Sequence, residues 1–146
     1  MISQTAEYAL RAVTCLAVAE GGPLTARQIA TLTRVPAGYL AKVLQSLVRS
    51  GLVESTRGVH GGFRLARRPQ EMSILDVVQA VDPLQRIRDC PLHLKAHRHR
   101  LCALHRRLDD AMRHIEEILG AASISDLLDE AEPVRPLRDA SQVFPE

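Results

Sequence analysis

The chain has 146 residues, 46% of them hydrophobic but only 3% aromatic, which fits one compact domain with an aliphatic core and favours packed helices. Its net charge of +2 conceals a basic half, residues 1–70 with nine Lys/Arg against three Asp/Glu, and an acidic half, residues 71–146 with ten against fourteen, so the first half is expected to contact a polyanion. No stretch approaches the roughly 20 apolar residues of a membrane span and no signal-peptide pattern is present, which excludes a membrane protein and predicts a cytoplasmic one.

Three helices are predicted at the start of the chain. Apolar residues recur at helical spacing over residues 2–20, and the Gly-Gly-Pro run at 21–23 ends that helix. Thr25 can cap a short helix, "ARQIATLT", and Pro36 suits the first position of a third helix, which Gly51 closes. Two short helices joined by "RVP" and preceded by a longer one are typical of a helix-turn-helix.

A two-stranded hairpin is predicted next. "LVEST" and "FRLA" are short β-prone runs, and "RGVHGG" between them has the composition of a turn. A hairpin with a basic tip in this place is the wing of a winged helix. Ser73 then caps a short helix that Pro83 terminates.

A long helix with a narrow apolar seam is predicted over residues 101–119. The residues of the seam are three and four positions apart: Leu101, Leu104, Leu108, Met112, Ile115 and Leu119. Such a helix needs a partner, and a homodimer is the economical answer, with packing against its own domain as the alternative. A short helix, "SISDLLDEA", follows.

The predicted fold class is mainly α with a small β-hairpin, a winged helix-turn-helix plus a long dimerisation helix. We expect a winged helix-turn-helix DNA-binding domain over residues 1–82 and a cysteine/histidine sensor loop over residues 83–100. The dimerisation helix and the short C-terminal helix should occupy residues 101–131. Residues 132–146 hold three prolines and no periodicity, so this tail is predicted to be disordered.

The second helix of a helix-turn-helix lies in the major groove with its N-terminal residues at the base edges. The residues predicted to face DNA lie at this end of the helix: Ala37, Gly38, Tyr39, Lys42 and Gln45. The residues on its other side should face the core: Leu40, Val43, Leu44 and Leu47. Arg57 and His60 lie in the hairpin tip, where a wing probes the minor groove. A solvated surface charge is the alternative for each basic residue, and a core position is the alternative for Tyr39.

Residues 90–105, "CPLHLKAHRHRLCALH", contain two of the three cysteines and four of the six histidines. Cys102 and His105 are three positions apart at the start of a helix and therefore share a face, and Cys90 can fold back to them. The candidates for a fourth ligand on the same loop are His97 and His93. A mixed-ligand two-iron cluster is favoured, with zinc, a thiol switch and incidental cysteines as alternatives. Cys15, on an apolar helix face, is expected in the core.

Two segments of the chain resemble a known family. The segments "YLAKVLQSLVRSGLVESTRGVHGGFRLAR" and "MISQTAEYALRAVTCLA" resemble the recognition helix with its wing, and the first helix, of the Rrf-two family of winged-helix transcription regulators (IscR/NsrR-like). The similarity covers roughly residues 1–120. It implies a homodimeric repressor that binds a near-palindromic double-stranded DNA operator. It also implies that an iron–sulfur cluster sensing redox, nitric oxide or iron–sulfur status controls operator affinity.

The resemblance also implies particular ligands. Cys90 and Cys102 match the first and third cysteine positions of the family's cluster loop, and His105 matches the histidine that completes the site in IscR-like members. Ala96 occupies the middle cysteine position, so one thiolate is missing. Glu7 occupies a first-helix position from which some members supply a carboxylate to the partner subunit's cluster. A 2Fe-2S cluster is favoured over 4Fe-4S, with zinc as the alternative.

Two other classes of function stand as alternatives. One is a winged-helix regulator without an iron–sulfur cluster, responding to zinc, thiol oxidation, a small molecule or a partner protein. The other is an enzyme such as a thiol oxidoreductase. The chain has no CxxC motif and no evident Ser/His/Asp or paired-carboxylate arrangement, so an enzyme is not predicted.

Overall fold

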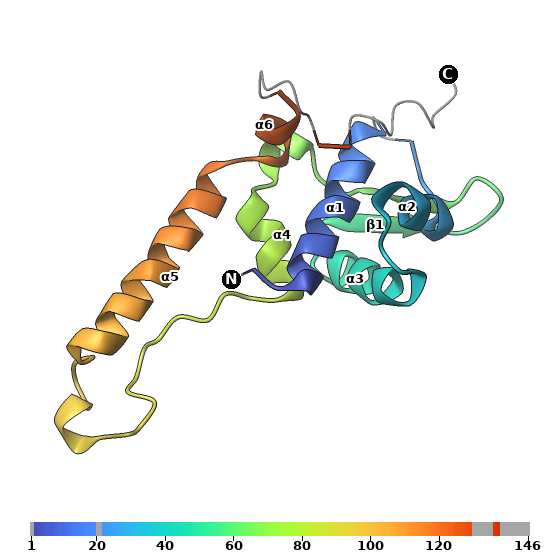
Figure 1. Cartoon of the computed structure of the whole chain (residues 1–146). Helices are drawn as coiled ribbons and strands as arrows, with labels where there is room; N and C mark the ends of the chain where they lie inside the picture. Colours follow the sequence, from blue (N-terminus) through green and yellow to red (C-terminus); the bar gives the residue numbers. More distant parts are fainter. Residues whose placement is uncertain (1, 20–21, 130–135, 138–146) are drawn as a thin grey trace.

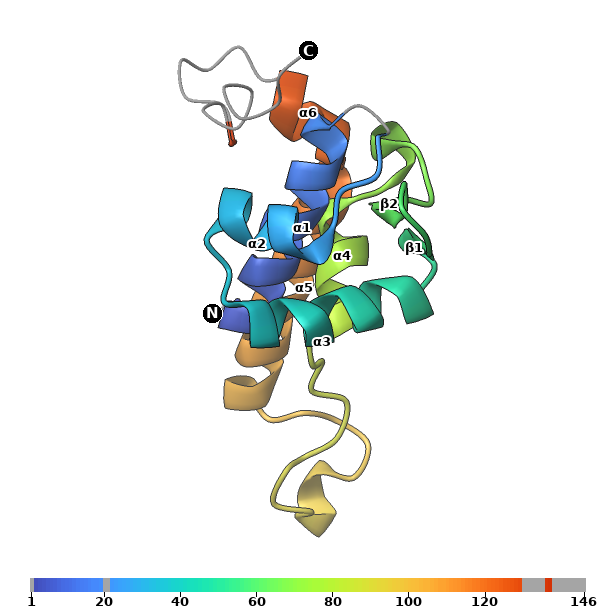
Figure 2. The ribbon, with the colours of Figure 1, turned by 90° about the vertical axis from the view of Figure 1, so that its right-hand side faces the viewer.

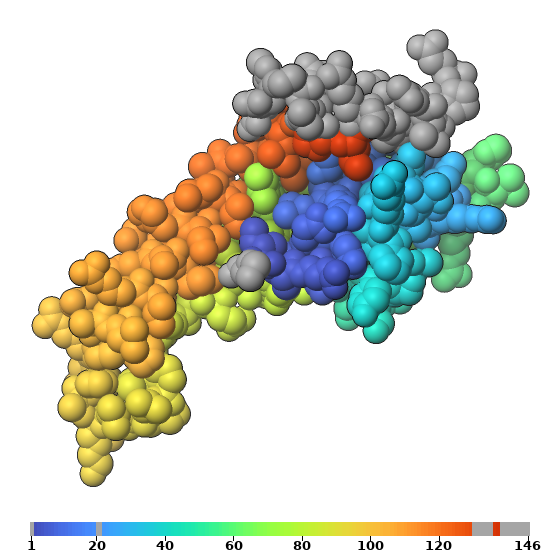
Figure 3. All heavy atoms as spheres, viewed as in Figure 1, coloured from blue at the N-terminus to red at the C-terminus, as the bar shows by residue number. Residues whose placement is uncertain are grey.

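The structure, a computed structural model, describes residues 2–19, 22–129 and 136–137. Figure 1 shows a body of packed helices and one hairpin, from which a long helix and the loop before it extend to one side. The same extension protrudes in the space-filling view of Figure 3. We call residues 83–121 the arm, and the rest of the described chain up to residue 129 the body.

Three helices form where the sequence predicts them: α1 (Gln4–Val18), α2 (Ala26–Thr33) and α3 (Ala37–Arg49). Thr25 caps α2 through a capping box with Gln28, which satisfies two backbone N–H groups at the start of the helix. Arg34 ends α2 in the left-handed conformation, with a φ of 55°. Pro36, expected as the first residue of α3, is instead its extended N-cap. The turn of the helix-turn-helix is therefore residues 34–36.

The predicted hairpin consists of β1 (Val53–Thr56) and β2 (Gly62–Leu65), which pair antiparallel. A second contact attaches it to the segment before α2, because Leu24 and Phe63 exchange two backbone hydrogen bonds of 2.9 and 2.7 Å. Gly62 makes this contact possible, since a Cβ there would lie 2.6 Å from the Leu24 carbonyl oxygen. Backbone hydrogen bonds on both sides thus hold the base of the wing.

The core lies where α1 packs against α2, α3 and α4 (Ile74–Val81). Figure 2 shows α3 crossing α1, with α2 toward one end of α3 and the hairpin toward the other. Ser73 and Asp76 form a second capping box at the start of α4, as the sequence predicts for Ser73. The largest fully buried side chains are aliphatic or sulfur-containing, which agrees with the scarcity of aromatic residues: Leu16, Ile29, Leu40, Leu44, Leu47, Met72 and Ile124.

The last described helix, α6 (Ile124–Asp129), packs on the body, against α1 and the 3-10 turn Pro69–Glu71. Ile124 is fully buried, and its N–H donates to the Met72 carbonyl oxygen at 2.8 Å. The Ile74 N–H donates to the Ala122 carbonyl oxygen at 3.0 Å. The C-terminal end of the arm is therefore anchored to the base of α4. Of the tail predicted to be disordered, only residues 136–137 fall within the described part of the chain.

The arm contains an irregular loop and α5 (Ala103–Ala121). The loop holds one short 3-10 turn, Lys95–His97. None of the residues of α5, all of which are described, is buried. Among its apolar side chains Leu104 is 63% exposed, and Leu108 is 48% exposed. Within the described residues, no helix has the length and apolar character needed to cross a membrane.

Candidate nucleic-acid interface and sensor loop

The recognition helix α3 has one buried side and one exposed side, divided as the sequence predicts. Each of the four residues expected to face inward is buried, with 0 to 3% exposure: Leu40, Val43, Leu44 and Leu47. Each of the five residues expected to face DNA is exposed: Ala37, Gly38, Tyr39, Lys42 and Gln45. No side chain caps the start of α3, so its first N–H groups add partial positive charge at this end. The helix therefore presents a polar, unobstructed face.

Tyr39 is a surface residue, because its side chain is 58% exposed. Its ring meets the Tyr8 ring edge-on with centroids 6.2 Å apart, and the Arg11 guanidinium lies 5.5 Å from the Tyr8 centroid. Arg11 also donates to the Thr33 carbonyl oxygen at 3.1 Å and to the Glu7 carboxylate at 2.7 Å. These contacts connect α1 to both helices of the helix-turn-helix.

The wing tip presents Arg57 and His60, both exposed, on either side of Val59, which is 96% exposed. Two glycines set the shape of the tip. Gly58 has a φ of 110°, and a Cβ on Gly61 would overlap the Thr56 carbonyl oxygen. The tip is thus a tight turn that holds its side chains away from the body.

Carboxylates on the body neutralise two of the three arginines that follow the tip. Arg64 pairs with Glu54 across the hairpin, and Arg68 pairs with Glu71 at 2.6 Å. Arg67, like Arg57 in the tip, has no ion-pair partner among the described residues. The unneutralised cations of the wing region therefore lie at the tip and at residue 67.

The predicted metal ligands of the arm form two separate cysteine–histidine pairs. Cys90 Sγ lies 3.5 Å from His97 Nδ1, and Cys102 Sγ lies 3.3 Å from His105 Nδ1. Cys102 is the N-cap of α5, so the predicted i, i+3 relation to His105 is realised in the first turn. Among the described residues, no three His, Cys, Asp or Glu side chains come together in a group that could hold a metal.

The three thiols differ in their environments. Cys15 is fully buried in the core, as expected, and burial raises the pKa of its thiol to about 11. A hydrogen bond from the Leu94 backbone N–H, followed by one from the His97 side chain, lowers the pKa of the Cys90 thiol. A thiolate is the form of cysteine that binds metals, so Cys90 is better prepared for ligation than Cys15.

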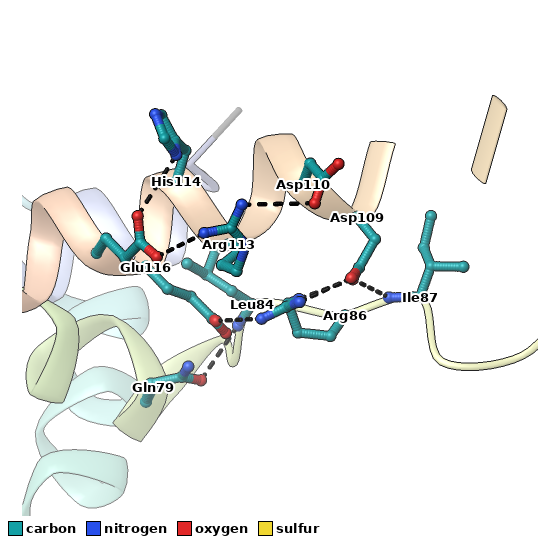
Figure 4. Close-up of polar contacts among 10 residues, drawn as sticks. Gln79, Leu84, Arg86, Ile87, Asp109, Asp110, Arg113, His114 and Glu116 are labelled. Carbon is teal, nitrogen blue, oxygen red and sulfur yellow. Dashed lines mark hydrogen bonds and ion pairs between the residues drawn. The ribbon is translucent and has the colours of Figure 1, made fainter. Parts of the chain in front are cut away.

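Arg86, which the sequence pattern did not single out, links the loop of the arm to α5 (Figure 4). Arg86 donates two hydrogen bonds of 2.7 Å to the two carboxylate oxygens of Asp109, and one of 3.1 Å to Glu116. The Ile87 N–H also donates to Asp109, at 2.9 Å. The Arg86 hydrogen bonds hold the pKa of Asp109 at about 2. The only sequence signal was weak: Asp109 and Glu116 are seven residues apart and therefore share one face of α5.

Comparison with known proteins identifies the family. The model of the Rrf2 (Rrf-two) family, described as "Iron-dependent Transcriptional regulator", matches residues 2–130. The chain belongs to the Rrf2 family. The HTH-type transcriptional regulator NsrR of Geobacillus kaustophilus (strain HTA426) is 31% identical to it over 137 residues, covering 90% of this chain and 91% of NsrR.

Two solved structures share the fold. T. potens IscR superposes with a TM-score of 0.72 at 25% identity, covering 90% of this chain and 88% of IscR. CymR (YrzC), the global cysteine regulator of B. subtilis, superposes with the same TM-score at 23% identity, covering 90% of this chain and 98% of CymR. The predicted family and fold class are confirmed. The chain is a winged-helix DNA-binding transcriptional regulator, and the family description agrees with the prediction that it is not an enzyme.

Proposed function

We propose that this Rrf2 regulator is a cytoplasmic homodimer that represses transcription from a near-palindromic operator, with its DNA affinity set by a two-iron iron–sulfur cluster on the arm. The observation that carries the proposal is the position of Cys102 at the N-cap of α5, beside His105. The same helix carries an exposed apolar seam that includes Leu104 and Leu108. A ligand at Cys102 therefore acts at the start of the helix that would join two subunits.

The body supplies the DNA contacts. In the major groove, Lys42 can donate to a guanine edge or a phosphate, and Gln45 can pair with adenine. In the wing, Arg57 and His60 are placed to enter the minor groove. These side chains project from a packed scaffold, so their relative positions are set before DNA binds.

The arm supplies the dimer. The apolar seam of α5 is exposed at Leu104 and Leu108 and half-buried at Met112, Ile115 and Leu119, and α5 also contacts α4. The exposed part is covered most simply by the same seam of a second copy. A two-fold axis through this seam would present two recognition helices to two half-sites. Half-sites for such dimers lie about 34 Å apart, which accounts for a near-palindromic operator.

The donor chemistry of the arm fits an iron–sulfur group, because two thiolates and imidazoles are accepted ligands of a two-iron cluster. Cys90, Cys102 and His105 would hold it. His97 is favoured as the fourth ligand, since it already lies beside Cys90, whereas Glu7 accepts a hydrogen bond from Arg11 of its own chain. Such a group, when bound, supplies a centre that oxidants and nitric oxide attack. The description of the family as iron-dependent supports iron over zinc.

Anaerobic purification tests the metal. We expect visible absorbance together with iron and sulfide in the wild-type protein, and their loss in a Cys90→Ala/Cys102→Ala double variant. His99→Ala is the matched control, because this exposed histidine of the same loop lies outside both cysteine–histidine pairs. If the protein is colourless and contains zinc, the site on the arm binds zinc and not an iron–sulfur cluster. A metal-free protein whose DNA affinity is the same in the wild type and in the double variant would exclude control of DNA binding by a metal.

A duplex selected from a random library by the wild-type protein tests the DNA contacts. Lys42→Ala and Arg57→Ala should each weaken binding by about 1–3 kcal/mol if they contact bases. Arg113→Ala is the control, because Arg113 is paired with Asp110 and Glu117 on α5. Binding should also fall steeply with added salt. Equal losses in all three variants, or no dependence on salt, would contradict the proposed interface.

A further inference from the structure

The outer end of the arm carries a hollow of about 470 Å³ whose wall is strongly cationic. Four arginines line it, with two histidines among them and a single carboxylate: Arg88, Arg98, Arg100, Arg106, His97, His99 and Asp89. We call it the arginine hollow. Figure 1 shows the loop that forms most of it (yellow) at the opposite end of the molecule from the wing.

The four arginines differ from Arg86 and Arg113 of the arm in having no ion-pair partner among the described residues. Arg86 pairs with Asp109 and Glu116, and Arg113 pairs with Asp110 and Glu117. None of the ion pairs within the described residues involves an arginine of the hollow. Four arginines thus line one open hollow that contains a single carboxylate, so their positive charges repel one another unless an anion binds there.

The start of α5 strengthens this positive potential. Arg106 lies in the first turn of the helix, which contains no acidic residue, and the N-cap residue Cys102 makes no side-chain hydrogen bond to the turn. Cations at a helix N-terminus oppose the helix dipole, which favours an anion there. The residue type is also informative, because a planar guanidinium binds two oxygens of one phosphate or carboxylate at once.

We propose that the arginine hollow binds an oxyanion of the phosphate class, held by Arg88, Arg98, Arg100 and Arg106. The proposal goes beyond the proposed function, since it needs neither the thiols nor a metal. The phosphate can come from a free phosphorylated small molecule or from the backbone of a bound duplex. The chemistry of recognition is the same in both cases.

Calorimetric titration of the metal-free full chain with inorganic phosphate and pyrophosphate, at constant ionic strength set with chloride, tests the proposal. We expect saturable binding at one site per chain. Arg98→Gln/Arg100→Gln should weaken it by about tenfold or more, equivalent to about 1.4 kcal/mol, because two of the four cations that would bind the anion are lost. Arg107→Gln is the matched control, since Arg107 follows Arg106 in the same helical turn but does not line the hollow. These exposed substitutions should leave the fold intact.

The same three proteins titrated with the selected duplex distinguish the two sources of phosphate. If DNA is the source, the double variant should lose affinity and the salt slope should fall by about 1 for each lost phosphate contact. If a free oxyanion is the source, the affinity of the double variant for the duplex should stay within about twofold of wild type, because surface substitutions away from a binding site usually have small effects. The proposal is overturned if neither phosphate, pyrophosphate nor duplex distinguishes the double variant from Arg107→Gln. It is also overturned if chloride competes as well as phosphate, and neither result depends on the metal content.

Discussion

The body and the arm are stabilised in different ways. The body has a continuous aliphatic core, and two capping boxes satisfy the starts of α2 and α4. In the arm, α5 has no buried residue, and among the described residues of the loop only Cys90 is buried. Packing therefore presents the side chains predicted to face DNA in one arrangement, whereas the arm is held by the contact of α5 with α4 and by polar contacts. This lower local stability suits the sensing role proposed for the arm, because a ligand can shift only a conformation that has accessible alternatives.

The largest expected effect separates a core position from an exposed one. Leu47→Ala should lower the free energy of unfolding by about 2–5 kcal/mol, since the side chain is fully buried in the core beneath the recognition helix. Val59→Ala, at the 96% exposed wing tip, should change it by about 0.5 kcal/mol or less. Urea denaturation followed by circular dichroism, at one fixed protein concentration, measures both. Similar losses in the two variants would contradict the described core.

A substitution on the arm should act on assembly instead. Leu108→Asp places a carboxylate in the exposed seam of α5, so we expect the dimer dissociation constant to rise by about tenfold or more, or 1.4 kcal/mol. Sedimentation equilibrium measures the constant. Arg107→Asp introduces the same side chain at the next position, off the seam, and should have a smaller effect. A wild-type protein that stays monomeric at high concentration would contradict the dimer.

A pH-dependent effect is expected at the Arg86–Asp109 pair. Because Arg86 lowers the pKa of Asp109 to about 2, below the roughly 3.9 of an unfolded chain, the pair contributes stability above about pH 4. That contribution is lost as the pH falls toward 2. The NMR shift of the Ile87 amide proton, which is bonded to Asp109, should titrate with a midpoint near pH 2. The titration should vanish in Asp109→Asn, and a midpoint near pH 4 would show that the pair does not form.

The smallest expected effect is a difference in labelling rate among the three thiols of the folded protein. At pH 8, with a pKa of about 11, roughly one Cys15 thiol in a thousand is ionised, and it is also inaccessible. We therefore expect iodoacetamide to label Cys15 more slowly than either arm cysteine in metal-free protein, as followed by peptide mass spectrometry. Labelling in 8 M urea, about the concentration that unfolds most domains, should remove the difference. Rapid labelling of Cys15 in native protein would contradict its burial.

Local signals predicted most of the body. The cap at Ser73, the short helix after Thr25 and the glycine-rich turn of the wing all act within about four residues, which is the range of a cap or a turn. Helical periodicity divided α3 correctly into a buried and an exposed side. The pairing of Cys102 with His105 was predictable for the same reason, because both lie in one helical turn.

Contacts between distant residues were not predictable in this way. The choice of His97 over His93 as the side-chain partner of the Cys90 thiol depends on the path of an irregular loop. The position of α6 on the body depends on the burial of Ile124 and on its backbone hydrogen bond to Met72. Neither contact produces a periodic pattern in the sequence, since each depends on how the folded chain brings separated segments together.

The sequence by itself determined the elements of this protein, their order, its family and the concentration of cysteine and histidine before the long helix. Only the tertiary structure decided which of these charged and ligating groups have partners. It joins Arg86 to Asp109 across 23 residues, and it leaves Arg88, two residues further along, without an ion-pair partner among the described residues. The physical reason is range. Caps and helical faces are set by neighbours within one turn, whereas ion pairs and cavities are set by the three-dimensional path of the chain.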